Sequence, residues 1–227
     1  MCDTRGGPRR VDPLPDERRV ALVSGGEEGL GPDIVRRLSA LGMRVVLGCR
    51  SVERGRLVID DLGELADGVA VRQLDVADAA SVGRLAAWVA GRLRRCDVLV
   101  CNLVIGPDGD PDGSDLESVR RELWTSLHGT WDLVQAMAPM MRAAGYGRVV
   151  TMIDDDLAST ALTRHRMARS AVNSLITLMA EQFADDGILA NAYCRQLEAS
   201  DQPLTGVEMP VWLATLPDDG PTGALYG

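Results

Sequence analysis

Short apolar runs alternate along the chain with longer segments in which apolar residues recur every three or four positions. Such runs are typical of strands buried on both faces, and the longer spacing is typical of helices that cover them. Parallel strands need crossovers of this kind, and the crossover is almost always right-handed. The pattern predicts an α/β fold with a doubly wound parallel sheet between two helical layers. The apolar runs are Val20–Val23, Val45–Leu47, Val69–Leu74, Val98–Val100, Val149–Met152 and Ile188–Tyr193.

The first 18 residues interrupt this pattern, because they are polar and mix arginines with prolines. They lack the apolar stretch of a signal peptide, and no later run is long enough to span a bilayer. We therefore expect a disordered tail at 1–18, a single domain at 19–227 and a cytoplasmic protein with no membrane partner.

The charge balance narrows the range of partners. The 227 residues carry a formal net charge of −9, and all 24 basic residues are arginine. Nucleic acids and anionic membranes are bound by clustered basic faces, which an acidic chain does not favour. The composition therefore predicts that the protein binds a small molecule and not a nucleic acid. If that small molecule is anionic, an arginine in the site must bind it.

The five cysteines have no metal-binding or redox spacing. Most of them stand inside the apolar runs, where a thiol behaves as a small hydrophobic side chain. We expect no metal site, and we expect every cysteine except Cys2 to lie in the core.

Residues 24–31 read Ser-Gly-Gly-Glu-Glu-Gly-Leu-Gly and connect the first strand to the first helix. Glycines at such a turn let the backbone approach a pyrophosphate, whose charge is favoured by the free N–H groups at the helix start. The turn predicts a nucleotide site rather than a merely structural bend. Its expected contacts are Ser24, Gly25, Gly29, Leu30 and Gly31.

The second strand ends in Gly-Cys-Arg-Ser, with Arg50 and Ser51 just beyond it. An acidic residue at this place accepts hydrogen bonds from a ribose 2′-hydroxyl, whereas an arginine suits a 2′-phosphate. The sequence thus favours NADP(H) over NAD(H), with a solvated surface arginine as the alternative.

Four motifs together resemble the short-chain dehydrogenase/reductase family, from Arg19 to Gly223. They are the glycine turn, Leu74-Asp75-Val76, Pro139-x-Met141 with Gly145-x-Gly147, and Gly187-Ile-x-x-Asn191-Ala. The C-terminal run from Pro210 is similar to that of carbonyl reductases that use NADPH.

This resemblance implies a Rossmann-type sheet of about seven parallel strands, with Asp75 and Val76 near an adenine ring. It also implies a homodimer or homotetramer built on two long helices, roughly Asp115–Arg142 and Arg164–Ala184.

The residues that depart from the family pattern are those expected near the nicotinamide and at the catalytic positions. Asn102 is retained in the family's Asn-Asn-Ala-Gly segment, but Leu103 and Val104 replace its small residues and are expected to narrow the cleft. Arg195-Gln196 replaces a Pro-Gly pair. By alignment, the family's catalytic asparagine, serine, tyrosine and lysine become Ser126, Asp154, His165 and Arg169, with Ile153 as the alternative for the serine if the alignment is shifted by one residue.

These replacements change the available chemistry. A guanidinium stays protonated, so Arg169 binds a ribose or phosphate but carries no proton. His165 donates or accepts a proton near neutrality. An ionised Asp154 repels a developing oxyanion, which argues against plain ketone reduction.

Three functions remain open. In the first, Asp154 and His165 form an acid/base pair for a non-redox cyclisation, dehydration or isomerisation of a small metabolite, with NADP(H) or no cofactor. In the second, the protein is an NADPH-dependent carbonyl reductase in which His165 replaces the tyrosine. In the third, it is a non-catalytic nucleotide-binding or partner protein. The arginine-rich, alanine-rich composition fits bacterial specialised metabolism, and the substrate is not readable from the sequence.

Overall fold

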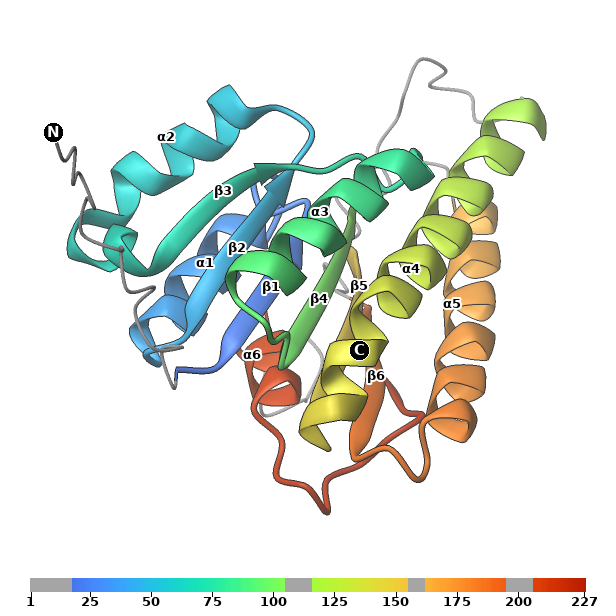
Figure 1. The fold of residues 1–227 in the computed structure, drawn as a ribbon. Helices are drawn as coiled ribbons and strands as arrows, with labels where there is room; N and C mark the ends of the chain where they lie inside the picture. Colours follow the sequence, from blue (N-terminus) through green and yellow to red (C-terminus); the bar gives the residue numbers. More distant parts are fainter. Residues whose placement is uncertain (1–17, 105–115, 155–161, 195–205) are drawn as a thin grey trace, which may run out of the picture.

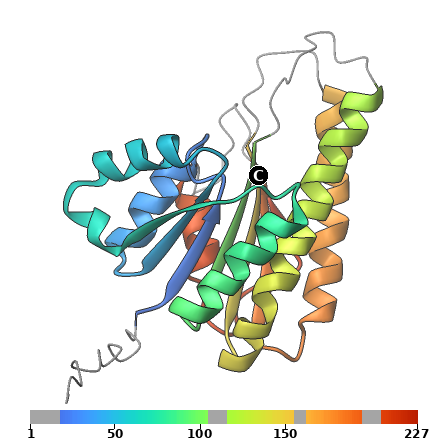
Figure 2. The ribbon, with the colours of Figure 1, turned by 45° about the horizontal axis from the view of Figure 1, so that its top comes forward.

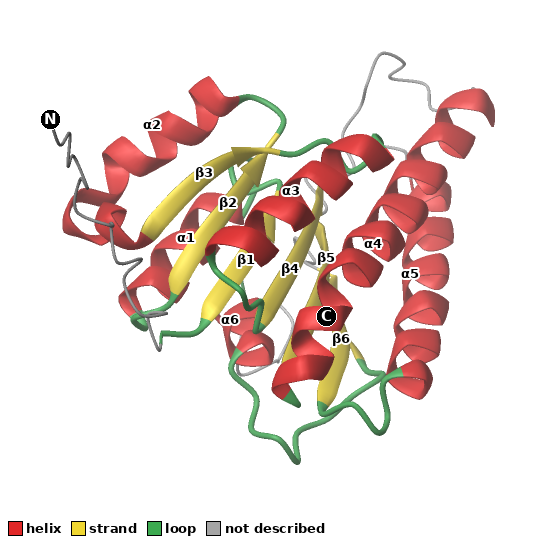
Figure 3. Cartoon of the chain, in the orientation of Figure 1, coloured by secondary structure: helices red, strands yellow, loops and turns green. Residues whose placement is uncertain are grey.

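The computed structural model describes residues 18–104, 116–154, 162–194 and 206–227; at 103–104, 116–123, 125–126, 153–154 and 162–169 it describes the backbone only. Strands and helices alternate along this part of the chain (Figure 3). In chain order the elements are β1 (Val20–Ser24), α1 (Gly31–Ala40), β2 (Arg44–Cys49), α2 (Val52–Leu62), a 3-10 helix (Gly63–Gly68), β3 (Val69–Gln73), α3 (Ala79–Arg92), β4 (Val98–Val104), α4 (Leu116–Ala144), β5 (Gly147–Asp154), α5 (Leu162–Gln182), β6 (Ile188–Cys194), α6 (Glu208–Ala214) and β7 (Leu225–Tyr226).

All seven strands form one parallel sheet in the order β3-β2-β1-β4-β5-β6-β7. The strand order reverses between β1 and β4, which places the switch point of the doubly wound fold beside β1. The fold is therefore the predicted Rossmann-type α/β sheet, with ligands expected at the carboxyl edge near β1 and β4.

Two helical layers cover the sheet (Figures 1 and 2). Helices α3, α4 and α5 pack on one face, where Leu133, Met137 and Phe183 are fully buried. Helices α1, α2 and α6 pack on the other face, with Ile34 and Leu38 at its centre. Met137 and Met141, one turn apart in α4, both lie in this core.

Each of the first six strands begins within about two residues of the apolar run that predicted it. Two details differ from the expectation. Strand β5 extends through Asp154, two residues beyond the apolar run that ends at Met152. Strand β7 has only two residues, too few to form a readable pattern, and it was expected from the resemblance alone.

Four cysteines match the expectation from their sequence positions: Cys49, Cys96, Cys101 and Cys194 all lie in the interior, and no disulfide joins them within the described part of the chain. Across the described ranges, no group of acidic, histidine and cysteine side chains is arranged to hold a metal. Nor does any helix within those ranges have the length and hydropathy needed to cross a bilayer. Residues 1–17, which include Cys2 and the expected tail, lie outside the described part of the chain.

Candidate functional site

The predicted nucleotide contacts gather at one edge of the sheet, where β1, β2, β3 and β4 end. The β1–α1 turn lies at the switch point, and helix α1 begins there at Gly31. Proline stands in the first turn of α1, and no side chain caps this helix start. A helix start without a side-chain cap leaves backbone N–H groups for another acceptor, which suits an anion.

The glycines of this turn have no room for side chains. Gly25 has φ +59°, and a Cβ added to it would lie 2.8 Å from the carbonyl oxygen of Asn102. A Cβ on Gly31 would lie 2.5 Å from the carbonyl oxygen of Gly25. Gly29 has φ +53°, a conformation that favours glycine. Close backbone approach and left-handed conformation therefore explain why glycines occupy these positions.

Asn102 holds the turn across the switch point. Its side-chain Nδ2 donates to the carbonyl oxygens of Gly25 and Glu28, at 3.0 Å each. Its Oδ1 is buried and accepts no hydrogen bond from the described residues. Buried polar atoms normally have partners, so this oxygen is an acceptor left for a further donor.

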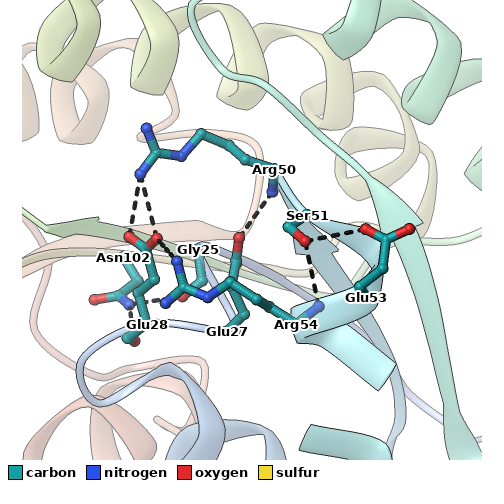
Figure 4. A network of polar contacts seen from close by, with 8 residues as sticks. All are labelled: Gly25, Glu27, Glu28, Arg50, Ser51, Glu53, Arg54 and Asn102. Carbon is teal, nitrogen blue, oxygen red and sulfur yellow. Dashed lines mark hydrogen bonds and ion pairs between the residues drawn. The ribbon is translucent and has the colours of Figure 1, made fainter. Parts of the chain in front are cut away.

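An ion-pair network covers the outer end of the turn (Figure 4). The Arg50 guanidinium approaches both oxygens of Glu28, at 3.2 and 3.4 Å. Arg54 donates to the same carboxylate at 2.8 Å. The Glu28 side chain is 17% exposed, whereas those of Arg50 and Arg54 are 66% and 55% exposed. Arg50, the expected phosphate ligand, is thus engaged by a carboxylate of this chain.

Glu27 lies beneath that network and is only 8% exposed. Its Oε1 accepts from the backbone N–H of Arg50 at 2.8 Å, and its Oε2 has no hydrogen-bond partner among the described residues. Burial first, and then the negative charges of Glu27 and Glu53, raise the pKa of the Cys49 thiol to about 11. The carboxylates of Glu27 and Glu53 therefore contribute a negative electrostatic potential at the end of β2, although Arg50 is close by.

Ser51 has a structural task. Its Oγ accepts from the backbone N–H of Arg54 at 3.3 Å, which caps helix α2. The hydroxyl lies 3.1 Å from the Glu53 carboxylate, and the pKa of Glu53 is lowered by its own backbone N–H and by this hydroxyl. The hydroxyl predicted to bind a phosphate is thus already part of a helix cap.

Asp75 and Val76 follow β3 at the same edge of the sheet. The carboxylate of Asp75 accepts from the backbone N–H of Ala77 at 3.0 Å, which forms a local turn. Val76 packs against Gly129 of α4, where a Cβ would lie 2.8 Å from the Val76 carbonyl oxygen. This close approach fixes α4 against the adenosine side of the site.

The predicted catalytic positions are described by backbone alone. Asp154 ends β5 and pairs in register with Val104 of β4. Ser126 belongs to α4, and His165 and Arg169 stand one turn apart in α5. Their side chains, and those of Leu103 and Val104, lie outside the description, as does the 195–205 segment. The roles of these residues stay predictions.

Four residues of the network were missed from the sequence: Glu27, Glu28, Glu53 and Arg54. A signal existed for Glu27 and Glu28, since both are charged residues that stand between the glycines of the turn. Arg54 stands four residues after Arg50, which is one helical turn. What the sequence left unknown is that Glu28 pairs with both arginines.

Comparisons with known proteins agree with this geometry. The family model for short chain dehydrogenase matches residues 19–198. A (2S)-[(R)-hydroxy(phenyl)methyl]succinyl-CoA dehydrogenase subunit from Thauera aromatica is 32% identical over 76% of this chain and 70% of its own. The oxidoreductase UcpA of Salmonella typhimurium is 28% identical over 78% of this chain and 68% of its own.

A solved structure extends the similarity to three dimensions. A metagenomic short-chain oxidoreductase in complex with NADP superposes with a TM-score of 0.75 at 26% identity, covering 92% of this chain and 96% of its own. The chain therefore belongs to the short-chain dehydrogenase family.

Proposed function

We propose that this protein is a nicotinamide-dinucleotide-dependent oxidoreductase that reduces the carbonyl group of a small organic substrate. The observation that carries the proposal is the backbone cradle of the β1–α1 turn, closed around Gly25 and Gly31 and held by Asn102. The glycines let the turn close against the backbone of Asn102 and of Gly25 itself. A turn of this kind leaves the N–H groups at the start of α1 for a pyrophosphate.

Some residues of this chain would bind the dinucleotide, and another would transfer a proton to the substrate. The turn and the start of α1 hold the pyrophosphate through backbone N–H groups and the helix dipole. A bound nicotinamide dinucleotide would supply a hydride to the substrate. His165 donates a proton to the carbonyl oxygen, and the permanently charged Arg169 binds and orients without transferring one.

The comparisons favour this oxidoreductase function over the non-redox step. The relatives described above bear the names of a dehydrogenase and an oxidoreductase, and the solved structure above contains NADP. The side chains of Asp154 and His165 lie outside the description, so their geometry favours neither function. Turnover without dinucleotide consumption is therefore the result that would favour the non-redox step.

The test combines dinucleotide binding with turnover on a panel of carbonyl compounds. NADH and NADPH are titrated by calorimetry and nicotinamide fluorescence, and oxidation is followed by absorbance. His165→Ala should lower turnover by about 10²–10⁴-fold while the dinucleotide Kd stays nearly constant, because only proton transfer is lost. Turnover should fall as the pH rises through the histidine pKa, ordinarily about 6.5, since the acid form is consumed.

The matched control is His128→Ala. His128 is exposed on α4, where its ring stacks on Trp124 with a centroid separation of 3.6 Å. This variant should retain wild-type turnover. Product formation without dinucleotide oxidation would support the non-redox function instead, and failure of both dinucleotides to bind would refute the proposal.

A further inference from the structure

We propose that Glu28 and the buried Glu27 make the adenosine end of this site selective for NAD(H) over NADP(H). The inference rests on the proposed function and reverses the preference that Arg50 alone suggests. These carboxylates accept a hydrogen bond from a free ribose 2′-hydroxyl, whereas they repel the negative charge of a 2′-phosphate.

The first argument is that Arg50 already has an anionic partner. Its guanidinium approaches Glu28 Oε1 and Oε2 at 3.2 and 3.4 Å, and Arg54 holds the same carboxylate at 2.8 Å (Figure 4). A forked guanidinium contact is the way in which an arginine recognises a phosphate. At Arg50 one nitrogen of the guanidinium, Nη2, is already shared between the two oxygens of a carboxylate of the chain itself. A 2′-phosphate would have to compete with Glu28 for Arg50 and approach its negative charge.

The second argument is the local charge. The network drawn in Figure 4 contains three carboxylates, those of Glu27, Glu28 and Glu53, and two guanidinium groups. Within this network the carboxylates outnumber the guanidinium groups by one, and Arg56, which is not part of it, acts on Glu53 alone among the three acids. Like charges brought together at a binding surface suppress the wrong ligand, so a 2′-phosphate is disfavoured here even if Glu28 swings aside.

The third argument is independent of the arginines and comes from Glu27. This side chain is 8% exposed, its Oε1 accepts from the Arg50 backbone N–H, and its Oε2 is buried with no hydrogen-bond partner among the described residues. An ionised carboxylate only accepts hydrogen bonds. When the Glu27 side chain turns its Oε2 toward the site, a ribose hydroxyl supplies the missing donor, whereas a phosphate oxygen adds a second acceptor beside it. The unpartnered atom therefore selects for a hydroxyl.

The test measures the dissociation constants of NADH and NADPH by calorimetry and nicotinamide fluorescence at about 0.1 M ionic strength, where such charges are only partly screened. The wild-type protein should bind NADH at least about tenfold more tightly than NADPH. Glu28→Gln should raise NADPH affinity about tenfold and leave NADH affinity nearly constant, because it frees Arg50 and removes a repelling charge.

Two further variants control for net charge and for the role of Arg50. Glu53→Gln removes the same charge from a neighbouring exposed acid that does not pair with Arg50, so it should raise NADPH affinity by clearly less than Glu28→Gln does. Adding Arg50→Ala to Glu28→Gln should abolish the gain in NADPH affinity. Unfolding in urea confirms that each variant is folded.

The outcomes separate this inference from the proposed function. Equal affinities, or tighter NADPH binding by the wild-type protein, would overturn the selectivity and leave a dinucleotide-dependent enzyme. The same holds if Glu28→Gln gains no NADPH affinity or gains no more than Glu53→Gln. If neither dinucleotide binds, the proposed function falls and the selectivity falls with it.

Discussion

Gly31 and Gly83 differ in the space around them, although both belong to helices. A Cβ on Gly31 would meet the Gly25 carbonyl oxygen at 2.5 Å and the Gly26 carbonyl carbon at 2.8 Å, both of which are backbone atoms. Gly83 in α3 is exposed, and a Cβ added there would have no neighbour within 4 Å among the described residues. The first glycine is required by packing, whereas the second only loosens its helix.

Gly31→Ala should therefore lower the free energy of unfolding by about 1–3 kcal/mol, because the backbone must move to admit the methyl group. Gly83→Ala, the matched control, should raise it by about 0.5–1 kcal/mol through helix propensity. Urea unfolding measures both values. Gly31→Ala should also weaken dinucleotide binding, and a variant with unchanged stability and affinity would show that the cradle is not closely packed.

Strand β5, whose end carries Asp154, is connected to the C-terminal segment by one buried arginine. Arg148 is fully buried, and its guanidinium donates to the carbonyl oxygen of Leu216 at 2.8 Å and to Asp218 at 2.7 Å. The Tyr146 ring lies against the same guanidinium, with 4.0 Å between the Arg148 Cζ and the ring centroid. These contacts hold the segment that follows α6 against strand β5.

Asp218→Ala should destabilise the protein by about 1–3 kcal/mol, since a buried guanidinium loses its charged acceptor. The Asp218 side chain is 85% exposed, so water replaces part of the lost interaction and the cost stays below that of a fully buried pair. The neighbouring Asp219→Ala, also exposed, is the control and should change stability by less than about 0.5 kcal/mol. Equal effects in urea unfolding would contradict a specific role for Asp218.

The whole molecule should gain stability from its cofactor, because the site joins the ends of four strands and the start of α1 in one parallel sheet. A ligand that binds only the folded state at a hundred times its Kd adds about 2.7 kcal/mol. For a domain of this size, that gain corresponds to a rise in Tm of about 5–11 °C.

Thermal unfolding with and without NADH measures this rise. Gly31→Ala should lose most of it at the same ligand concentration, whereas Gly83→Ala should retain it. Calorimetry verifies that NADH is saturating. If the wild-type Tm is then unchanged, NADH does not bind to the part of the protein that unfolds cooperatively, and this prediction is contradicted.

Local patterns in the sequence were sufficient for the class of fold, the glycine turn and the burial of the thiols. Apolar runs mark buried strands, the three-to-four spacing marks helices, and glycines mark positions without room for Cβ. The resemblance added the seventh strand and the positions of His165 and Arg169. It added no description of their side chains, so their chemistry remains a prediction.

Which groups meet became known only from the folded chain. Asn102 holds a turn whose Gly25 lies 77 positions earlier, and Arg50 pairs with Glu28 across 22 positions. Local patterns do not encode such partners, because they arise when separate strands end at one edge of the sheet. Arg50 taken alone suggested a phosphate ligand, whereas Arg50 beside Glu28 suggests a ribose hydroxyl. The physical reason is that the effect of a charged side chain depends on the groups around it, and the tertiary structure determines which groups those are.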